Sequence, residues 1–286
     1  MSLQKQYINL NGDYFDANEP ILSHRNRGFL YGDALFETIH ANGTQLQFFD
    51  DHLSRLQEGM RRLGMTPSPS IQSGNIEKEC VKLLQKNKHL KGARVRITVF
   101  RNQGGKYTPE NNHSSYLIDS ENLPFDQYRL NEKGYHIDLF SELKKPLNFL
   151  SNLKTTNDLI YVLAGNFKAS HNLDECILIN QHNEVCEGIS SNVFMVKNDV
   201  LKTPPLRSGC LDGIMRRKVL SFAASVDLKI SDNHPITPQE LLESDEIFFT
   251  NAIKGIQWVG GFRQKRYYKQ TAKLLTEVLN EKTKLE

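Results

Sequence analysis

The chain has 286 residues, 38% of them hydrophobic, and a formal net charge of +3 from 36 basic and 33 acidic residues. This is enough for one large or two modest domains with real cores, and the lack of a long basic block argues against nucleic-acid binding. The first ten residues lack the apolar run of a signal peptide, and no segment approaches a membrane span. We therefore expect a cytoplasmic protein that acts on neither membranes nor nucleic acid.

Cysteine and histidine spacing argues against disulfides and metal sites. The four cysteines form no Cys-x-x-Cys pair, and the nine histidines include no His-Glu-x-x-His motif. Such cysteines suit reduced thiols in a cytosolic protein better than a disulfide framework. We expect no metal ion.

The N-terminal part is predicted to combine strands and helices. Tyr7–Leu10 and Asp13–Phe15 flank Asn11-Gly12, a pair that favours the tight turn of a hairpin. Asp50 or Asp51 can cap a helix that runs to about Gly64. The buried stripe of this helix recurs at helical spacing and consists of Leu53, Leu56, Met60 and Leu63. The next predicted elements are a helix over Ile76–Leu84 and neighbouring strands over Arg94–Val99 and Ser114–Ile118.

A polar segment that ends in proline, Ser120–Pro124, follows the last of these strands and is typical of a connector. We place the domain boundary there. The prediction is an N-terminal domain over residues 1–120, a linker over 121–128 and a C-terminal domain over 129–286.

The second half alternates strands and helices more regularly. Thr156 or Asn157 can cap a helix that carries Leu159, Ile160, Leu163 and Phe167. Thr237-Pro238-Gln-Glu240 forms a capping box with proline at the first helical position. The other predicted helices cover Gly213–Val226 and about Tyr268–Leu279. The predicted strands are His136–Phe140, Cys176–Asn180, Ser191–Val196, Asp227–Ile230 and Glu246–Thr250. The pattern predicts two α/β domains, with ligands in the crevice between them.

Four short motifs supply the groups that one cofactor needs. Lys154, in Leu150-Ser-Asn-Leu-Lys154-Thr-Thr-Asn157, offers an amine, and Glu187 follows it by 33 residues with a carboxylate. Gly213-Ile-Met-Arg216 begins a helix whose N–H groups can cradle a phosphate, and Thr250-Asn251 follow an apolar strand as a second anion site. Pyridoxal phosphate requires an amine for its aldehyde, an acid beside its ring nitrogen and donors for its phosphate. Each motif alone has an ordinary explanation, but their order and context make the combination informative.

In this order the motifs resemble those of the fold-type IV pyridoxal-phosphate enzymes, also called class IV aminotransferases. The resemblance covers nearly the whole chain, from Asn26-Arg-Gly-Phe-Leu-Tyr-Gly32-Asp33-Ala-Leu-Phe36-Glu-Thr38 to Thr250-Asn-Ala252. It implies the two-domain α/β fold of D-amino acid aminotransferases, with a smaller N-terminal α+β domain and a larger C-terminal α/β domain. It also implies a homodimer that acts on a small-molecule substrate.

The resemblance implies roles for individual residues. Lys154 resembles the Schiff-base lysine, which holds the cofactor and later moves protons. Glu187 resembles the carboxylate that keeps the ring nitrogen protonated, so that the ring can accept electrons. Arg55, which lies off the apolar stripe of its helix, resembles the phosphate-binding arginine. The other implied cofactor contacts are Gly213, Ile214, Met215, Thr250 and Asn251 at the phosphate, and Ser191 and Asn192 near the ring hydroxyl.

Two stretches resemble 4-amino-4-deoxychorismate lyases more than transaminases. Transaminases of this family usually have Gly-Ile-Thr-Arg or Gly-Val-Thr-Arg at the phosphate helix, whereas this chain has Met215 in place of the threonine. In Phe100–Tyr107, the order Arg101, Gly104-Gly105, Tyr107 also resembles the lyases, although a glycine pair equally suits a flexible hairpin tip. We expect a lyase of folate biosynthesis that converts 4-amino-4-deoxychorismate to 4-aminobenzoate and pyruvate.

In that reaction the departing pyruvate needs a proton donor, for which Thr38 and Lys154 are both candidates. Arg27 and Arg101 are predicted to pair with substrate carboxylates, and Tyr107 to contact the substrate. Two alternatives remain open. One is a class IV aminotransferase acting on D-amino or branched-chain amino acids, which needs a keto-acid acceptor. The other is a non-catalytic relative that acts as a binding protein, against which the intact Lys154 and Glu187 argue.

Overall fold

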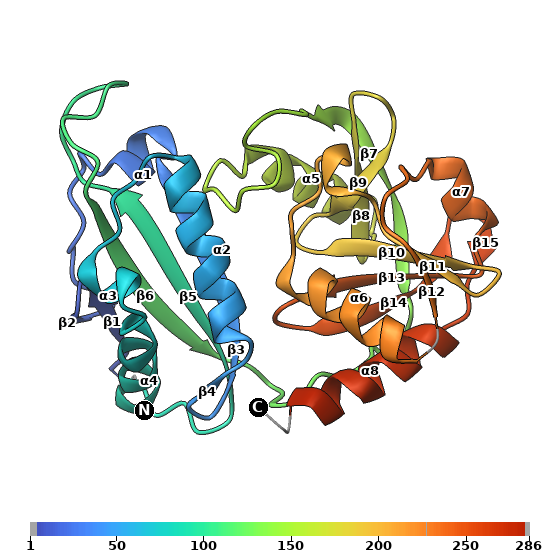
Figure 1. Ribbon diagram of the computed structural model, residues 1–286, viewed down its shortest axis with the longest axis horizontal. Helices are drawn as coiled ribbons and strands as arrows, with labels where there is room; N and C mark the ends of the chain where they lie inside the picture. Colours follow the sequence, from blue (N-terminus) through green and yellow to red (C-terminus); the bar gives the residue numbers. More distant parts are fainter. Residues whose placement is uncertain (1–4, 227, 284–286) are drawn as a thin grey trace. The chain divides into compact units, whose positions relative to one another are not determined.

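The computed structural model describes residues 5–226 and 228–283, which divide into two compact units (Figure 1). The first unit comprises Met1–Gln127 and Lys154–Asn157, and the second comprises Tyr128–Leu153 and Asp158–Glu286. The division after Gln127 falls within the predicted linker over 121–128. The return of residues 154–157 to the first unit was not predicted.

Within the described residues, the first unit is built on a six-stranded antiparallel sheet in the order β2-β1-β6-β5-β3-β4. Its strands are β1 (Tyr7–Leu10), β2 (Asp13–Asp16), β3 (Ala34–Asn42), β4 (Gln45–Leu46), β5 (Gly92–Arg101) and β6 (Ser114–Asn122). The predicted hairpin is confirmed, with positive φ at both Asn11 (54°) and Gly12 (99°). The predicted connector at Ser120–Pro124 is wrong for its first three residues, because β6 continues to pair with β5 as far as Asn122.

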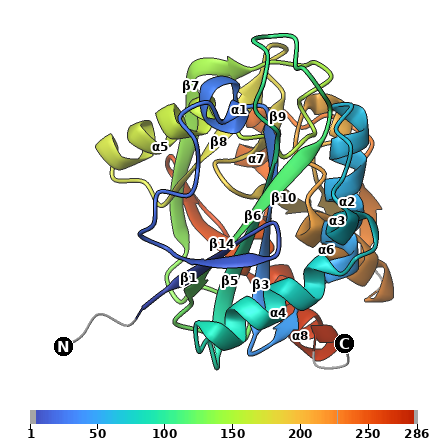
Figure 2. The same cartoon turned by 90° about the vertical axis from the view of Figure 1, so that its left-hand side faces the viewer.

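Helices α2 (Phe49–Arg62) and α4 (Ile76–Lys86) cover one face of this sheet, and the short α3 (Pro69–Gln72) lies beside α2 (Figures 1 and 2). The remaining helix described in this unit, α1 (Arg27–Tyr31), precedes β3. The predicted cap of α2 is wrong. Phe48, with a left-handed φ of 56°, is the N-cap, whereas Asp50 and Asp51 lie in the first turn, where their charge favours the helix dipole.

In the part of the second unit that the structure describes, nine strands form one mixed sheet in the order β12-β11-β10-β13-β14-β7-β8-β9, with β15 paired to β14. The strands are β7 (Tyr135–Lys145), β8 (Glu175–Asn180), β9 (Val185–Gly188), β10 (Asn192–Lys197), β11 (Val200–Lys202), β12 (Lys229–Ser231), β13 (Glu246–Asn251), β14 (Gly255–Phe262) and β15 (Lys265–Arg266). The strand predicted over Asp227–Ile230 is found as β12, and Asp227 itself lies outside the described residues. β14 was missed because three glycines interrupt its apolar pattern.

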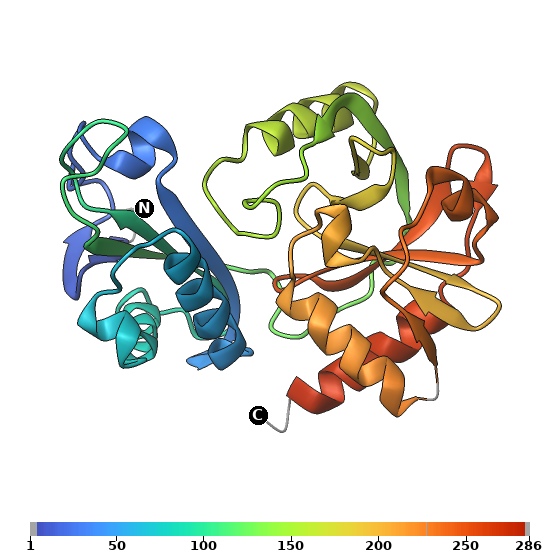
Figure 3. The same cartoon turned by 45° about the horizontal axis from the view of Figure 1, so that its top comes forward.

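The helices of the second unit are α5 (Leu159–Ser170), α6 (Ile214–Ser225), α7 (Pro238–Glu243) and α8 (Gln270–Thr283), with a 3₁₀ turn, η1, at Leu206–Ser208. Figure 3 shows α6 and α8 side by side. The capping box of α7 is confirmed, since Thr237 and Glu240 each accept from the other's backbone N–H. Among the described helices, none is both long and apolar enough to cross a membrane.

The predicted N-cap of α5 is wrong. Its N-cap is Asp158 and not Thr156 or Asn157, because Thr155 forms a bridge with Leu35 of β3 and Thr156 N–H donates to Ala34 of the same strand. Of the four apolar residues that the sequence analysis placed on this helix, two are packed against the core. Ile160 and Phe167 pack on the cluster around Phe140 and Leu178, while Leu159 and Leu163 are 70% and 38% exposed.

Candidate active site

Glu187 lies at the centre of a buried polar cluster in the second unit. Its carboxylate, on β9, accepts from the Nζ of Lys145 and from the hydroxyl of Tyr161 (2.7 Å), both at Oε1. Its other oxygen, Oε2, accepts from the backbone N–H of Leu211 (2.7 Å). Burial, followed by the charge of Glu187, raises the pKa of Tyr161, so this phenol stays a neutral donor. Two neutral donors and one ammonium thus hold a carboxylate that is only 4% exposed.

The Leu211 segment connects this cluster to the start of α6. The carbonyl of Leu211 accepts from the side-chain amide of Asn192 (2.8 Å) and from the N–H of Gly213 (2.9 Å). Gly213 is the N-cap of α6 and has no side chain with which to cap the helix. A Cβ at Gly213 would lie 1.9 Å from Asn192 Oδ1, so this position is sterically restricted to glycine unless Asn192 moves. The first turn of α6 therefore presents backbone N–H groups beside Asn192, as an anion site needs.

Thr250 adds an unsatisfied hydroxyl to this region. It is the Cα partner of Asn192 across the antiparallel β10–β13 pair, so the two side chains share one face of the sheet. Its Oγ1 is buried and has no hydrogen-bond partner among the described residues. A buried hydroxyl without a partner is costly, which indicates a ligand with acceptor oxygens at this point.

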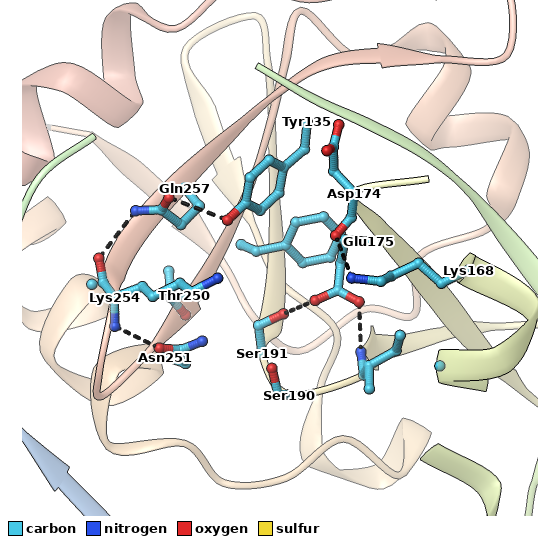
Figure 4. Close-up of a pocket in the computed structure, with 14 residues that line it drawn as sticks. Tyr135, Lys168, Asp174, Glu175, Ser190, Ser191, Thr250, Asn251, Lys254 and Gln257 are labelled. Atoms are coloured by element: carbon cyan, nitrogen blue, oxygen red, sulfur yellow. Dashed lines mark hydrogen bonds between the residues drawn. The ribbon is translucent and has the colours of Figure 1, made fainter. Parts of the chain in front are cut away.

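Ser191 and Asn251 line a cavity of about 220 Å³ within the second unit, and Thr250 lines the same cavity (Figure 4). Figure 4 shows Ser191 directed toward Glu175, to which its hydroxyl donates weakly (3.4 Å). Burial raises the pKa of Glu175, while the N–H groups of Cys176 and Ile189 donate to it. The structure thus separates the predicted pair: Asn192 faces the start of α6, and Ser191 is held by Glu175.

In the first unit, Lys154 lies against β3. Its carbonyl accepts from the N–H of Phe36 (3.0 Å), and its Nζ lies 4.2 Å from the centroid of the Phe36 ring. Side chains alternate along a strand, so Thr38 lies on the same face of β3 as Phe36. Thr38 is partly exposed. The structure therefore brings the predicted amine and one predicted proton donor to the same face of β3.

Arg55 is held by a carboxylate on the opposite face of β3. Its Nε and Nη2 bind the two oxygens of Glu37 at 2.8 and 2.6 Å, and Nδ1 of His52 lies 2.6 Å from Glu37 Oε2. Burial alone would raise the pKa of Glu37, but Arg55 and His52 outweigh it and lower the pKa to about 2. Burial lowers the pKa of His52. Glu37 is therefore a fixed anion that orients the guanidinium of Arg55.

Arg27 and Arg101 are also held by a carboxylate of the first unit. Nε of each lies 2.9 Å from Asp33 Oδ2. Nη1 of Arg27 donates to the carbonyls of Gly104 and Lys106, and Arg101 donates to those of Leu63 and Gly64. Both arginines are buried. Arg27 therefore holds the loop that precedes Tyr107, whereas Arg101 holds the turn after α2. Pairing of either arginine with a substrate carboxylate stays a prediction.

Tyr107 itself is 90% exposed, and its ring lies 5.6 Å from that of Tyr31. Gly104 and Gly105 have φ of 126° and 68°, angles that disfavour other residues. The loop therefore displays Tyr107 at its surface, where a ligand can reach it.

Comparisons with known proteins show the family and the fold of this chain. A family model described as amino-transferase class IV matches residues 34–260. This chain belongs to the amino-transferase class IV family. A provisionally named branched-chain-amino-acid aminotransferase of Methanocaldococcus jannaschii is 29% identical over 251 residues, 87% of this chain and 85% of that protein. The aminodeoxychorismate lyase of Bacillus subtilis is 27% identical over 255 residues, 86% of this chain and 83% of that protein.

The predicted fold is confirmed. The branched-chain aminotransferase of the thermophilic archaeon Thermoproteus uzoniensis, solved with norvaline, superposes with a TM-score of 0.86 at 23% identity, covering 98% of this chain and 95% of that chain. Membership of the class IV family makes the protein a pyridoxal-phosphate-dependent enzyme. The residues of the second unit fit that cofactor, because the orphaned hydroxyl of Thr250 and the uncapped start of α6 suit its phosphate.

The sequence did not indicate Lys145, Tyr161, Glu37 or Asp33 as members of these clusters. Lys145 stands beside Lys144 in a charged stretch that is typical of a solvated surface, and only the ordering of β7 against β8 and β9 turns it inward. Glu37 and Asp33 do lie within the N-terminal motif Asn26–Thr38, so that motif could have identified them.

Among the described residues, no group of three or more His, Cys, Asp or Glu side chains is arranged to hold a metal ion. The four cysteines are free and buried, and burial raises the pKa of each thiol.

Proposed function

We propose that this enzyme is a lyase that converts 4-amino-4-deoxychorismate to 4-aminobenzoate and pyruvate. The observation that carries the proposal is Met215, the second residue of α6, whose side chain is buried where transaminases resembling this chain have a threonine hydroxyl. The phosphate is then held by the backbone donors of Gly213, Ile214 and Met215, by Thr250 and by Arg55. Asn192 would lie beside these donors, and Ser191 and Asn251 line the cavity that Thr250 also lines.

Lys154 would bind the cofactor and then move protons. When bound, pyridoxal phosphate supplies an aldehyde that captures amines and a ring that withdraws electrons. The amine of Lys154, once displaced by substrate, takes the proton from the ring carbon that bears the substrate's amino group. Glu187 faces the ring nitrogen and stabilises positive charge there. Loss of the enolpyruvyl group then yields pyruvate and an aromatic ring, so no second substrate is required.

Thr38 is the candidate that the structure supports as proton donor to the departing pyruvate. Its position on the same face of β3 as Phe36 puts its hydroxyl on the side of the strand where the Lys154 amine lies. Lys154 itself remains the other candidate. The exposed Tyr107 would contact the substrate, with Arg27 fixing the loop that precedes it.

The decisive experiment is incubation of the purified enzyme with 4-amino-4-deoxychorismate in the absence of any keto acid, with products followed by mass. We expect 4-aminobenzoate and pyruvate in equal amounts, and no product from Lys154→Ala. The second candidate is an aminotransferase, which the Methanocaldococcus jannaschii relative favours. Transfer of an amino group from a D-amino or branched-chain amino acid to 2-oxoglutarate, with no 4-aminobenzoate formed, would replace the lyase proposal.

We further propose that the enzyme works as a homodimer in the cytoplasm. Exposed apolar side chains gather on α5 and the segment before it, namely Leu150, Leu159, Val162 and Leu163. A surface of this kind is typical of a protein interface, and four buried free thiols suit a reducing compartment. Sedimentation of the enzyme and of Leu159→Glu should give a dimer and a monomer, respectively.

A further inference from the structure

Lys145 is a buried cation that the proposed reaction does not use. It is the last residue of β7, only 5% exposed, and its Nζ contacts Oε1 of Glu187. The same Nζ lies 5.5 Å from the centroid of the Tyr161 ring. Its neighbour Lys144 is exposed and donates to Asn183. Adjacent lysines on one strand thus occupy opposite environments.

Burying an ammonium is expensive, even beside a carboxylate, and an apolar residue often serves stability as well or better. A purely structural role is therefore a poor explanation for Lys145. Of the donors that the structure describes for Glu187 within the second unit, Tyr161 and the N–H of Leu211 are neutral, and only Lys145 carries charge. The carboxylate therefore meets the cofactor with its charge already balanced.

We propose that Lys145 is a positioning residue that balances the charge of Glu187 and so limits how firmly the ring nitrogen of the cofactor holds a proton. This inference rests on the proposed role of Glu187 toward that nitrogen. An ammonium in contact with a carboxylate opposes a second cation on the same group, and burial leaves the repulsion weakly screened. The ring then withdraws electrons less strongly than beside an isolated carboxylate, which suffices for a reaction driven by aromatisation.

The test is a pH titration of the ring nitrogen by ¹⁵N NMR, with the enzyme reconstituted with ring-¹⁵N pyridoxal phosphate. We expect the wild-type nitrogen to lose its proton within about pH 6 to 9. Lys145→Met should raise the midpoint by about one pH unit or more, since removing a neighbouring positive charge favours the protonated form. Lys145→Arg, which keeps the charge, should restore the wild-type midpoint.

Two controls separate charge from contact. Tyr161→Phe removes a neutral donor from the same oxygen of Glu187 and should shift the midpoint much less than Lys145→Met does. Lys144→Met removes a positive charge from the exposed neighbour and should not shift it. Equal midpoints for wild type and Lys145→Met would overturn the proposal. If Lys145→Met does not fold, the titration of the wild-type enzyme is the test. A ring nitrogen that stays fully protonated from about pH 6 to 9 would overturn the proposal.

Failure of the inference and failure of the proposed function give different results. Suppose that the enzyme binds the cofactor on Lys154 and forms 4-aminobenzoate, but that Lys145→Met leaves the titration midpoint of the ring nitrogen unchanged. That result refutes only the inference about Lys145. If borohydride reduction and peptide mapping place the cofactor on another residue, the proposed roles of Lys154 and Glu187 fail first.

Discussion

Glu37 in the first unit and Glu187 in the second are both buried against a basic side chain, but the two glutamates are held in different ways. Glu37, in the first unit, gives both oxygens to the guanidinium fork of Arg55 and one also to His52. Glu187, in the second unit, is held by one amine, one phenol and one backbone N–H. Bidentate pairing fixes an arginine rigidly, whereas single donors leave a carboxylate oxygen with room for one more partner.

This difference shows how a buried glutamate can either hold another side chain in place or take part in catalysis itself. The low pKa of Glu37 makes it a permanent anion whose effect reaches a ligand only through Arg55. Glu187 has its own donors on both oxygens, yet retains acceptor capacity for a ring nitrogen. Replacing either acid by its amide should therefore damage different properties.

The largest expected effect is on turnover at Glu187. Glu187→Gln removes the charge that we propose to face the ring nitrogen and should lower kcat/KM by about 10³-fold, the size seen when preorganised electrostatic groups are removed. Glu37→Gln, measured at saturating cofactor, should lower it by less than about tenfold, because its carboxylate acts through Arg55. Steady-state kinetics of both variants check this. Equal losses would show that the two acids do not differ in function.

The next effect is on stability at Glu37. Glu37→Gln leaves the buried Arg55 fork without its counter-ion and should lower the free energy of unfolding by about 3 kcal/mol. Urea unfolding of the cofactor-free protein measures this loss. Glu58→Gln is the control, since Glu58 also pairs with an arginine on α2 but at the surface. It should leave the unfolding midpoint unchanged; a similar loss there would mean that burial of Glu37 is not the cause.

The sequence predicted much of this comparison but not its supporting contacts. Period-two and helical patterns located most elements of both units, and the family motifs pointed to Lys154, Glu187 and Arg55, whose roles stay predictions. The patterns failed where tertiary pairing overrides local composition, as where residues 154–157 join β3 instead of capping α5. They also could not reveal Lys145, because a lysine at the end of a strand has the same local signature whether it faces water or a buried carboxylate.

The pH dependence of the free energy of unfolding should show separately how much the buried anion Glu37 contributes to stability. Its pKa is about 2 in the folded protein against an ordinary value of 4.5, so it binds fewer protons folded than unfolded between these values. Its contribution is therefore complete above about pH 4.5 and is lost as the pH falls toward 2. Urea unfolding at several pH values should show that, below about pH 4.5, the free energy of unfolding falls less steeply for Glu37→Gln than for wild type. Equal slopes would contradict the low pKa of Glu37.

The smallest expected effect concerns the orphaned hydroxyl of Thr250. Thr250→Val keeps the shape of the side chain but removes Oγ1, so the cofactor dissociation constant should rise by about tenfold, the worth of one hydrogen bond to a charged acceptor. Because Oγ1 has no partner in the part of the chain that the structure describes, the stability of the cofactor-free form should not fall. Thr276→Val is the matched control: its buried hydroxyl donates to Ala272, so it should lose stability and keep cofactor affinity. Absorbance titrations and urea unfolding of both variants measure the two properties. A loss of stability without a loss of affinity in Thr250→Val would remove Thr250 from the proposed phosphate site.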